Sequence, residues 1–298
     1  MEYSIQNDYL KVTAEEKGAE LRSILSGDGT EYLWQGDPAY WEDRALNIFP
    51  CIGRNPDDRY SLDGKQYTMG LHGFGWTEQY VLTEKTQTRM CFTLTDRQTT
   101  FDCYPRHFVF HVIYSLSENV LDITFQVENR DTQMLYFAVG GHPGIRVPLS
   151  PDAKFTDYRL RFSEACRPRR LGFVEDCLDG TDTLFELKDD QMLPLRHELF
   201  DADAIVLKDV SREVTLEREG DTCSVTVRYP DMPYLGIWHT PQTDAPFVCI
   251  EPWSALPAID GKTVVMEKKK DLFRLEAGET FVTTWQMILR KNNTGQDD

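Results

Sequence analysis

The chain has 298 residues, of which 41% are hydrophobic and 27% are charged, so it can bury the core of one large domain or of two ordinary ones. Its 32 basic and 49 acidic residues give a formal net charge of -17, which disfavours nucleic acid and anionic membranes as partners. The N-terminal segment has neither the basic n-region nor the apolar h-region of a signal peptide. No later apolar stretch approaches the length of a membrane span. We therefore expect a cytoplasmic protein, a monomer or weak homodimer, whose seven widely spaced cysteines stay reduced.

Alternation of apolar and polar residues with period two is the main structural signal along the chain. In the segment 121–127, Leu121, Ile123, Phe125 and Val127 fall on one face of a half-buried strand. The same pattern predicts strands over 89–96, 108–116, 214–219, 223–229 and 281–289, whereas short helices are expected only near 38–44 and 189–199.

The predicted strands extend from near residue 3 to near residue 290 without a linker rich in Pro, Gly or Ser. This continuity predicts one all-β domain over residues 1–290, built as an antiparallel sandwich with few short helices. The polar residues 291–298 are expected to form a frayed tail.

Three short segments place an ionisable group among glycine, proline and aromatic residues, where the strand alternation stops. They are the segments 70–76 with His72, 140–144 with His142, and 249–253 with Glu251. A histidine at a strand end is commonly just hydrogen-bonded, but a Gly-Gly-His-Pro turn has little reason to use histidine for packing. Glu251 follows an apolar strand, so its carboxylate has either a partner or a function.

Arg54 and several tryptophans are weaker candidates. Arg54 follows the apolar run 48–52, and its planar guanidinium could donate hydrogen bonds to sugar hydroxyls, although alone it is better interpreted as a surface cation. Trp76, Trp238 and Trp253 lie in or near the three segments, where an indole face can stack on a pyranose, but most aromatic residues of such a chain belong to the core.

Taken in order, these segments resemble the aldose 1-epimerase (galactose mutarotase) family, most closely its LacX-like bacterial branch. The matching pieces are Phe49-Pro50-x-x-Gly53-Arg54, Tyr60-x-x-Asp63-Gly64-Lys65-x-Tyr67, His72-Gly73-Phe74, Gly141-His142-Pro143, Phe200-x-x-Asp203-Ala204, Leu235-Gly236-Ile237-Trp238 and Cys249-Ile250-Glu251-Pro252-Trp253. Each piece is weak alone, and their specificity comes from their order along nearly the whole chain.

The resemblance implies a β-supersandwich that binds a free hexose in a cleft, without a metal or organic cofactor. It implies that His142 is the general acid on the ring oxygen and that Glu251 is the general base on the anomeric hydroxyl. His72 then assists catalysis, and Arg54 and Asp203 bind hydroxyls, with Trp238 as an aromatic neighbour of the sugar. The expected activity is that of an isomerase.

The chain departs from galactose-specific members of the family at two places, which leaves the identity of the sugar open. The usual Asn-Arg pair is Gly53-Arg54 here, and the segment 200–204 offers both Asp201 and Asp203. The acid–base pair is unaffected. Because Glu251 must be ionised to accept a proton, we expect Arg54 or His72 to hold its pKa low.

Three other functions compete with mutarotation of a free sugar. A glycoside hydrolase could use Asp203 and Glu251 as its two carboxylates. A carbohydrate-binding or sensing protein could keep the cleft without catalysis. A hexose 6-phosphate mutarotase could use Arg106 and the basic cluster 167–170, although the strongly negative net charge disfavours it.

Overall fold

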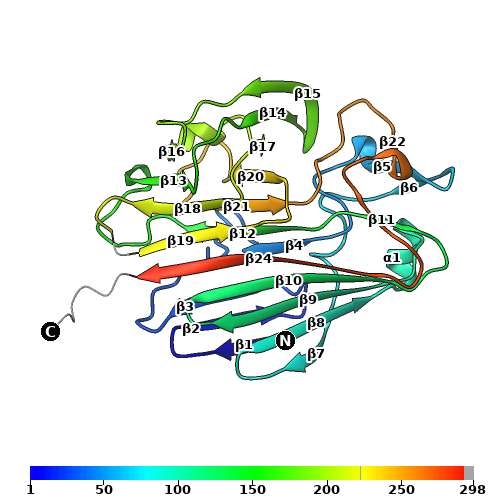
Figure 1. Ribbon diagram of the computed structural model, residues 1–298, viewed down its shortest axis with the longest axis horizontal. Helices are drawn as coiled ribbons and strands as arrows, with labels where there is room; N and C mark the ends of the chain where they lie inside the picture. The colour runs from blue at the N-terminus through cyan, green and yellow to red at the C-terminus, as the bar shows by residue number, and fades with distance from the viewer. Residues whose placement is uncertain (222, 292–298) are drawn as a thin grey trace.

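The structure is a computed structural model that describes residues 1–221 and 223–291. Antiparallel β-strands dominate it, in two large sheets and three small ones (Figure 1). The nine-stranded sheet contains, in spatial order, β16 (Met192–Pro194), β13 (Tyr158–Phe162), β18 (Glu213–Arg218), β19 (Cys223–Arg228), β24 (Thr280–Lys291), β10 (Val120–Asn129), β9 (Phe108–Ser117), β8 (Arg89–Thr95) and β7 (Val81–Lys85). The prediction of an all-β antiparallel fold is confirmed.

The seven-stranded sheet carries the chemically interesting segments. It contains, in spatial order, β15 (Cys177–Leu184), β14 (Arg169–Val174), β17 (Ile205–Lys208), β20 (Tyr234–Trp238), β21 (Phe247–Trp253), β12 (Gly140–Arg146) and β4 (Ala45–Ile48). The small sheets pair β1 (Glu2–Gln6), β2 (Leu10–Glu15) and β3 (Leu21–Ser26), then β22 (Val264–Val265), β5 (Arg59–Leu62) and β6 (Lys65–Thr68), and finally β11 (Leu135–Phe137) and β23 (Phe273–Leu275).

The predicted strands form because alternate side chains enter one core between the layers. In β10, Leu121, Ile123, Phe125 and Val127 are fully buried, while the residues between them are partly exposed. The two large sheets approach closely where β12 crosses β24, since a Cβ added to Gly141 would lie 2.4 Å from the indole ring of Trp285. The boundaries predicted for β8, β9, β10, β18, β19 and β24 agree with the structure to within about three residues.

Helices are short, and neither of the two segments predicted to hold one forms an α-helix. Residues 38–44 contain a turn, in which the backbone carbonyl of Asp37 accepts hydrogen bonds from the amides of Tyr40 and Trp41 before the chain extends into β4. Residues 189–199 form a turn, β16 and the start of a 3₁₀ helix, η3 (His197–Phe200). The other helices are α1 (Gln98–Cys103), which the sequence pattern missed, and the 3₁₀ turns η1 (Pro56–Asp58), η2 (Phe155–Asp157) and η4 (Met266–Lys268).

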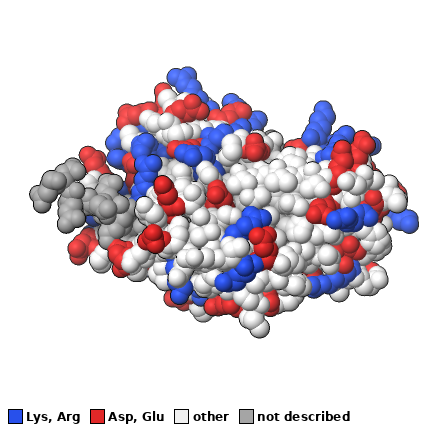
Figure 2. Space-filling model, turned by 60° about the horizontal axis from the view of Figure 1, so that its bottom comes forward, with Lys and Arg blue, Asp and Glu red and all other residues white. Residues whose placement is uncertain are grey.

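At the C-terminal end, Lys291 is the last residue of β24, so the tail predicted from residue 291 cannot begin there. Residues 292–298 lie outside the described residues, and the single domain over residues 1–290 stays a prediction. No described helix is long and apolar enough to cross a membrane. Acidic and basic side chains are interspersed on the face shown in Figure 2.

Candidate active site

His142 and Glu251 face each other on neighbouring strands. The pairs Gly140–Trp253 and Gly144–Cys249 fix the register of β12 against β21, and this register places His142 opposite Glu251. Nε2 of His142 lies 3.3 Å from Oε2 of Glu251, and the two residues are 8% and 1% exposed. The sheet geometry alone therefore aims both side chains at the same place.

His72 reaches the same place from the loop that follows β6. Its backbone has a φ of 57°, in the left-handed region, and its ring lies 5.6 Å from the ring of His142. Nδ1 of His72 accepts a hydrogen bond of 3.1 Å from the backbone amide of Gly53. In the neutral ring the proton is therefore on Nε2, which can donate to a ligand.

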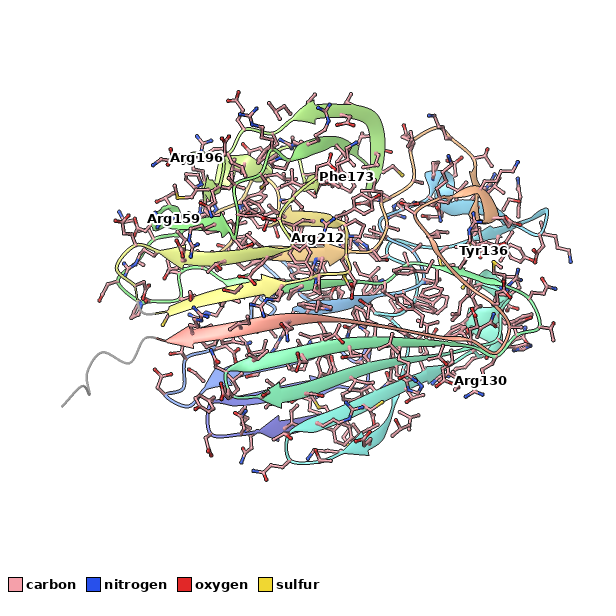
Figure 3. The ribbon with its side chains drawn as sticks, in the orientation of Figure 1. Arg130, Tyr136, Arg159, Phe173, Arg196 and Arg212 are labelled. Carbon is pink, nitrogen blue, oxygen red and sulfur yellow. The ribbon has the colours of Figure 1, made fainter. Side chains whose placement is uncertain are left out.

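A cavity of about 330 Å³ opens at these three side chains. Five aromatic rings contribute to its wall, including Phe173 from β14, which is labelled in Figure 3. Four carboxyl groups also line it, and no lysine or arginine is found among its described lining residues. The full lining is Trp41, Asp43, Leu46, Leu71, His72, Trp76, His142, Phe173, Asp176, Asp203, Ala204, Trp238, Pro241, Glu251 and Trp253.

Asp203 is the better placed of the two candidate aspartates. It follows η3 with a φ of 72° and lines the cavity, whereas Asp201 is exposed to solvent. Its Oδ1 accepts a hydrogen bond of 3.0 Å from the indole N–H of Trp238, which is also a lining residue. Trp238 thus orients the carboxylate and contributes a ring surface at the same time.

Arg54 lies outside the cavity lining. Its guanidinium forms ion pairs of 2.7 Å with Asp58 and 3.2 Å with Asp176, and only Asp176 belongs to the cavity wall. The backbone amide of Arg54 also donates to the carbonyl of Asp176. In this structure Arg54 therefore holds the turn between β14 and β15 against the cavity.

Burial sets the protonation of the central pair. It raises the pKa of Glu251 well above its usual range, and the nearby Asp203 adds to that rise. It also lowers the pKa of His142 to about 4, and it lowers the pKa of His72 well below normal. The prediction that Arg54 or His72 holds the pKa of Glu251 low is wrong, because desolvation dominates the shift and neither residue is among its causes. At a pH above the pKa of His142, about 4, and below the raised pKa of Glu251, the pair therefore holds one proton.

Buried polar atoms without a partner surround the cavity. Among the described residues, Nδ1 of His142 has no hydrogen-bond partner, and Oε2 of Glu251 has none besides its 3.3 Å contact with Nε2 of His142. Such atoms are costly in a protein interior unless a ligand or solvent satisfies them. Their concentration beside an acid and a base is typical of a binding site for a hydroxylated molecule.

The sequence matches the aldose 1-epimerase family over residues 1–263. The chain belongs to this family. It is 33% identical over 285 residues to the chromosomal LacX protein of Lactococcus lactis subsp. lactis, covering 92% of this chain and 95% of that protein. It is also similar to a solved galactose mutarotase related enzyme from Lactobacillus acidophilus, with a TM-score of 0.93, 30% identity and full coverage of both chains. A galactose mutarotase-like protein from Lactobacillus casei gives a TM-score of 0.91 at 29% identity, covering 97% of this chain and 100% of that one.

Gly53, where this member of the aldose 1-epimerase family departs from the usual asparagine, has a structural reason. Its φ is 64°, and a Cβ there would lie 2.6 Å from the ring of Pro257 and 2.8 Å from the carbonyl oxygen of Asp176. Because the backbone at residue 53 lies so close to Pro257 and to Asp176, only glycine fits at this position.

Several wall residues of this aldose 1-epimerase-like cavity were missed from the sequence, among them Trp41 and Asp176. The ring of Trp41 lies 5.0 Å from the ring of His142 in a tilted arrangement, and Asp176 carries the ion pair with Arg54. Asp176 follows Glu175 in a turn where both residues have positive φ, which gives no signal for a ligand. For Trp41 the available signal was an aromatic residue in a polar loop, and this is too common to be specific.

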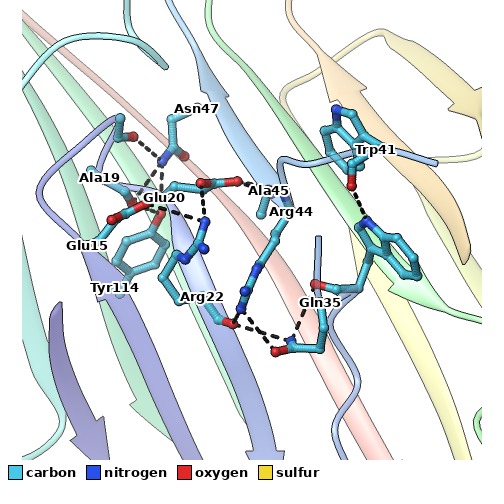
Figure 4. A network of polar contacts seen from close by, with 12 residues as sticks. Glu15, Ala19, Glu20, Arg22, Gln35, Trp41, Arg44, Ala45, Asn47 and Tyr114 are labelled. Carbon is cyan, nitrogen blue, oxygen red and sulfur yellow. Dashed lines mark hydrogen bonds and ion pairs between the residues drawn. The ribbon is translucent and has the colours of Figure 1, made fainter. Parts of the chain in front are cut away.

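A buried polar network fixes the loop that carries Trp41 (Figure 4). Oε1 of Glu20 accepts hydrogen bonds from the backbone amides of Arg44 and Ala45, at 2.5 and 3.0 Å. The carbonyl of Trp41 accepts a hydrogen bond of 2.8 Å from the indole of Trp34. Hydrogen bonds thus hold both ends of the segment 41–45, and they fix the position of the Trp41 indole ring beside His142.

Ligating atoms of His142, Cys249 and Glu251 lie within 4.8 Å of one another, which is a possible metal geometry. Burial raises the pKa of the Cys249 thiol well above normal, with Glu251 adding to the rise. A protonated thiol is a poor metal ligand. Binding of a divalent metal here would require the Cys249 thiol to lose its proton, and the absence of a metal stays a prediction.

Proposed function

We propose that this protein is an aldose 1-epimerase that interconverts the α and β anomers of a free, uncharged aldose. The observation that carries the proposal is the buried His142–Glu251 pair, 3.3 Å apart, whose two residues line one cavity. Binding alone does not require an acid and a base held in contact. The family membership supports the same reaction.

The single proton of the pair suits the chemistry. Transfer of this proton from Glu251 to His142 produces a carboxylate base beside an imidazolium acid. Glu251 takes the proton from O1 of the sugar, while His142 gives its proton to the ring oxygen O5. The C1–O5 bond breaks, the aldehyde forms, rotation about C1–C2 exposes its other face, and the reverse transfers close the ring. The pair again holds one proton at the end.

The wall of the cavity favours a neutral sugar over a phosphorylated one. Its four carboxyl groups, those of Asp43, Asp176, Asp203 and Glu251, can accept hydrogen bonds from hydroxyls, and no described lining residue is a lysine or an arginine. Arg106, the cation considered for a phosphate, instead pairs with Asp63 at 2.7 Å, and neither residue lines the cavity. A phosphate group would therefore find carboxyl groups and no lysine or arginine among the described residues of this wall.

The experiment is a substrate panel followed by polarimetry or by NMR of the anomeric protons. Freshly dissolved α-glucose and α-galactose should equilibrate faster with the protein, whereas their 6-phosphates should follow the uncatalysed rate. Acceleration of the 6-phosphates alone would contradict the neutral-sugar assignment.

A non-catalytic carbohydrate-binding protein is the second candidate, favoured by the aromatic wall of the cavity. It predicts sugar binding by calorimetry together with equilibration of every sugar at the uncatalysed rate. Nitrophenyl glycosides serve as the control for a glycoside hydrolase, because release of nitrophenol would favour that reaction instead.

A further inference from the structure

A second cluster of reactive side chains lies on the nine-stranded sheet, on the face that points to solvent. It comprises Cys91 and Thr93 on β8, His111 on β9 and Glu128 on β10. Thr93 pairs with His111 in the register of β8 against β9, and Val81, the partner of Thr93 in β7, is 58% exposed. Because alternate residues share a face, Cys91 and Glu128 lie on this same outer side.

The contacts link a thiol, an imidazole and a carboxylate in series. Sγ of Cys91 lies 3.8 Å from Nδ1 of His111, and Nε2 of His111 lies 3.2 Å from Oε1 of Glu128. The hydroxyl of Thr93 is 2.8 Å from the same Nδ1 atom. Glu128 is held in turn by the amide of Gln126, at 3.0 Å, and by Arg130, which is labelled in Figure 3.

The carboxylate decides which nitrogen of His111 carries the proton. Glu128 accepts from Nε2–H, so the lone pair of the neutral ring is on Nδ1, directed at the hydroxyl of Thr93 and at the thiol. A nucleophile next to a base that a third group orients is the arrangement that activates cysteine. Burial raises the pKa of Cys91, but hydrogen bonds, the largest from His111, outweigh it and lower the pKa overall. The same contact raises the pKa of His111.

In five of the other six cysteines, the pKa of the thiol is shifted in the direction opposite to that of Cys91. Burial raises the pKa of the thiols of Cys51, Cys103, Cys166, Cys177 and Cys249. Cys103 and Cys166 are nevertheless more exposed than Cys91, which is 7% exposed. If exposure decides reactivity, Cys103 or Cys166 should react first, and if activation by His111 decides it, Cys91 should react first. The proposal can therefore be tested by the order in which the cysteines react.

The edge of the sheet is distorted next to the thiol. In β7 the register shifts between Leu82 and Glu84, opposite Phe92 and Cys91. A β-bulge at this point bends the edge strand and re-aims the neighbouring side chains. The side chains of His111 and Glu128 are 17% and 16% exposed, so the cluster is at the surface rather than in the core.

We propose that Cys91 is a modification site that takes low-molecular-weight disulfides by thiol–disulfide exchange, with His111 as its base. His111 accepts the thiol proton, and the Cys91 sulfur attacks one sulfur of the disulfide RS–SR. A new S–S bond forms, the old S–S bond breaks, and RS⁻ leaves and takes the proton from His111. The site is on the nine-stranded sheet and does not depend on the sugar cavity.

The test uses the folded full-length protein and oxidised glutathione as the probe, between pH 6 and pH 9, with intact mass and peptide mapping as readouts. We expect the first adduct on Cys91, formed at pH 7 at least about tenfold faster than on Cys166, since one pKa unit is a factor of ten in thiolate. Cys91→Ser should remove this fast adduct, whereas the matched control Cys166→Ser should leave it unchanged.

His111→Gln should move the pH dependence of the Cys91 reaction to higher pH. Glu128→Gln should move it in the same direction by less, and it keeps the imidazole if His111→Gln does not fold. First reaction at Cys166 or Cys103 would overturn the proposal. So would a pH profile of Cys91 that neither folded variant shifts.

Discussion

The stability of the protein should depend on pH in a way that the buried His142–Glu251 pair dictates. Between about pH 4.5 and pH 6.5, an unfolded chain carries one proton on these two groups, on the histidine. The folded pair also carries one proton, because burial raises the pKa of Glu251 and lowers that of His142 to about 4. The pair therefore adds no pH dependence within this window.

Above pH 6.5 the balance changes. The unfolded histidine loses its proton, while folded Glu251 keeps its proton up to its raised pKa. The folded state then binds more protons, so stability falls as pH rises, by about 1.4 kcal/mol per pH unit. From pH 6.5 to pH 8 this amounts to up to about 2 kcal/mol. Glu251→Gln removes the titrating carboxyl, so this part of the fall should disappear.

Urea denaturation of the wild type and of Glu251→Gln at pH 6.5, 7.0, 7.5 and 8.0 measures the effect. The difference between the two free energies of unfolding cancels the contributions of all other groups. We expect the variant to gain on the wild type steadily across this range. Parallel curves would refute the reasoning, because they would show that Glu251 titrates alike in the folded and unfolded states.

Four further predictions concern packing, backbone conformation, ligand binding and metal. Asn47→Ala should lower the free energy of unfolding by about 1–3 kcal/mol, measured in urea, because the buried Asn47 amide donates to two backbone carbonyls and to a tyrosine hydroxyl. Gly53→Ala should destabilise more than Gly64→Ala: both have positive φ, but a Cβ meets neighbours within 3 Å only at Gly53. Similar melting temperatures for the two variants would contradict that account. Trp238→Phe removes the hydrogen bond from the indole to Asp203 and should raise KM about tenfold, with a smaller change in kcat. Unchanged kinetics would show that Asp203 does not need this hydrogen bond to bind the sugar. Prolonged dialysis against EDTA should leave mutarotation unchanged, and activity that is lost and then restored by zinc would contradict the prediction that the reaction uses no metal.

The strands could be predicted because a sheet with one buried face imposes period-two alternation on the sequence. The segment of β10 shows this most clearly, since the residues assigned to its apolar face are fully buried. Short helices gave no comparable signal. The residues 38–44 form one turn that the backbone carbonyl of Asp37 closes, and such a turn has no periodicity to detect.

The candidate site was predictable in its residue types but not in its geometry. A proline directly after an ionisable group singled out His142 and Glu251. Both residues lie in strands rather than in the expected turn, and their opposition depends on the register of β12 against β21. That register joins segments more than 100 residues apart, and only the order of the motifs suggested it. The residues next to His142 and Glu251 in the sequence do not indicate this register.

The electrostatics of the site could not be predicted at all. The pKa of Glu251 depends on complete burial and on the proximity of Asp203, and both are products of tertiary packing. Trp41 and Asp176 were missed for the same reason, since each lies in a loop whose position is set by distant partners. The side chain of Arg54, expected to bind sugar, pairs instead with Asp58 and Asp176.

The most direct test of the proposed reaction compares the wild type with Glu251→Gln and His142→Gln in the mutarotation of α-glucose and α-galactose, followed by polarimetry. The wild type should accelerate at least one sugar, and each variant should lose about 10²–10⁴-fold of that acceleration while still binding the sugar by calorimetry. Acceleration of a sugar by the wild type that both folded variants retain in full would contradict the account.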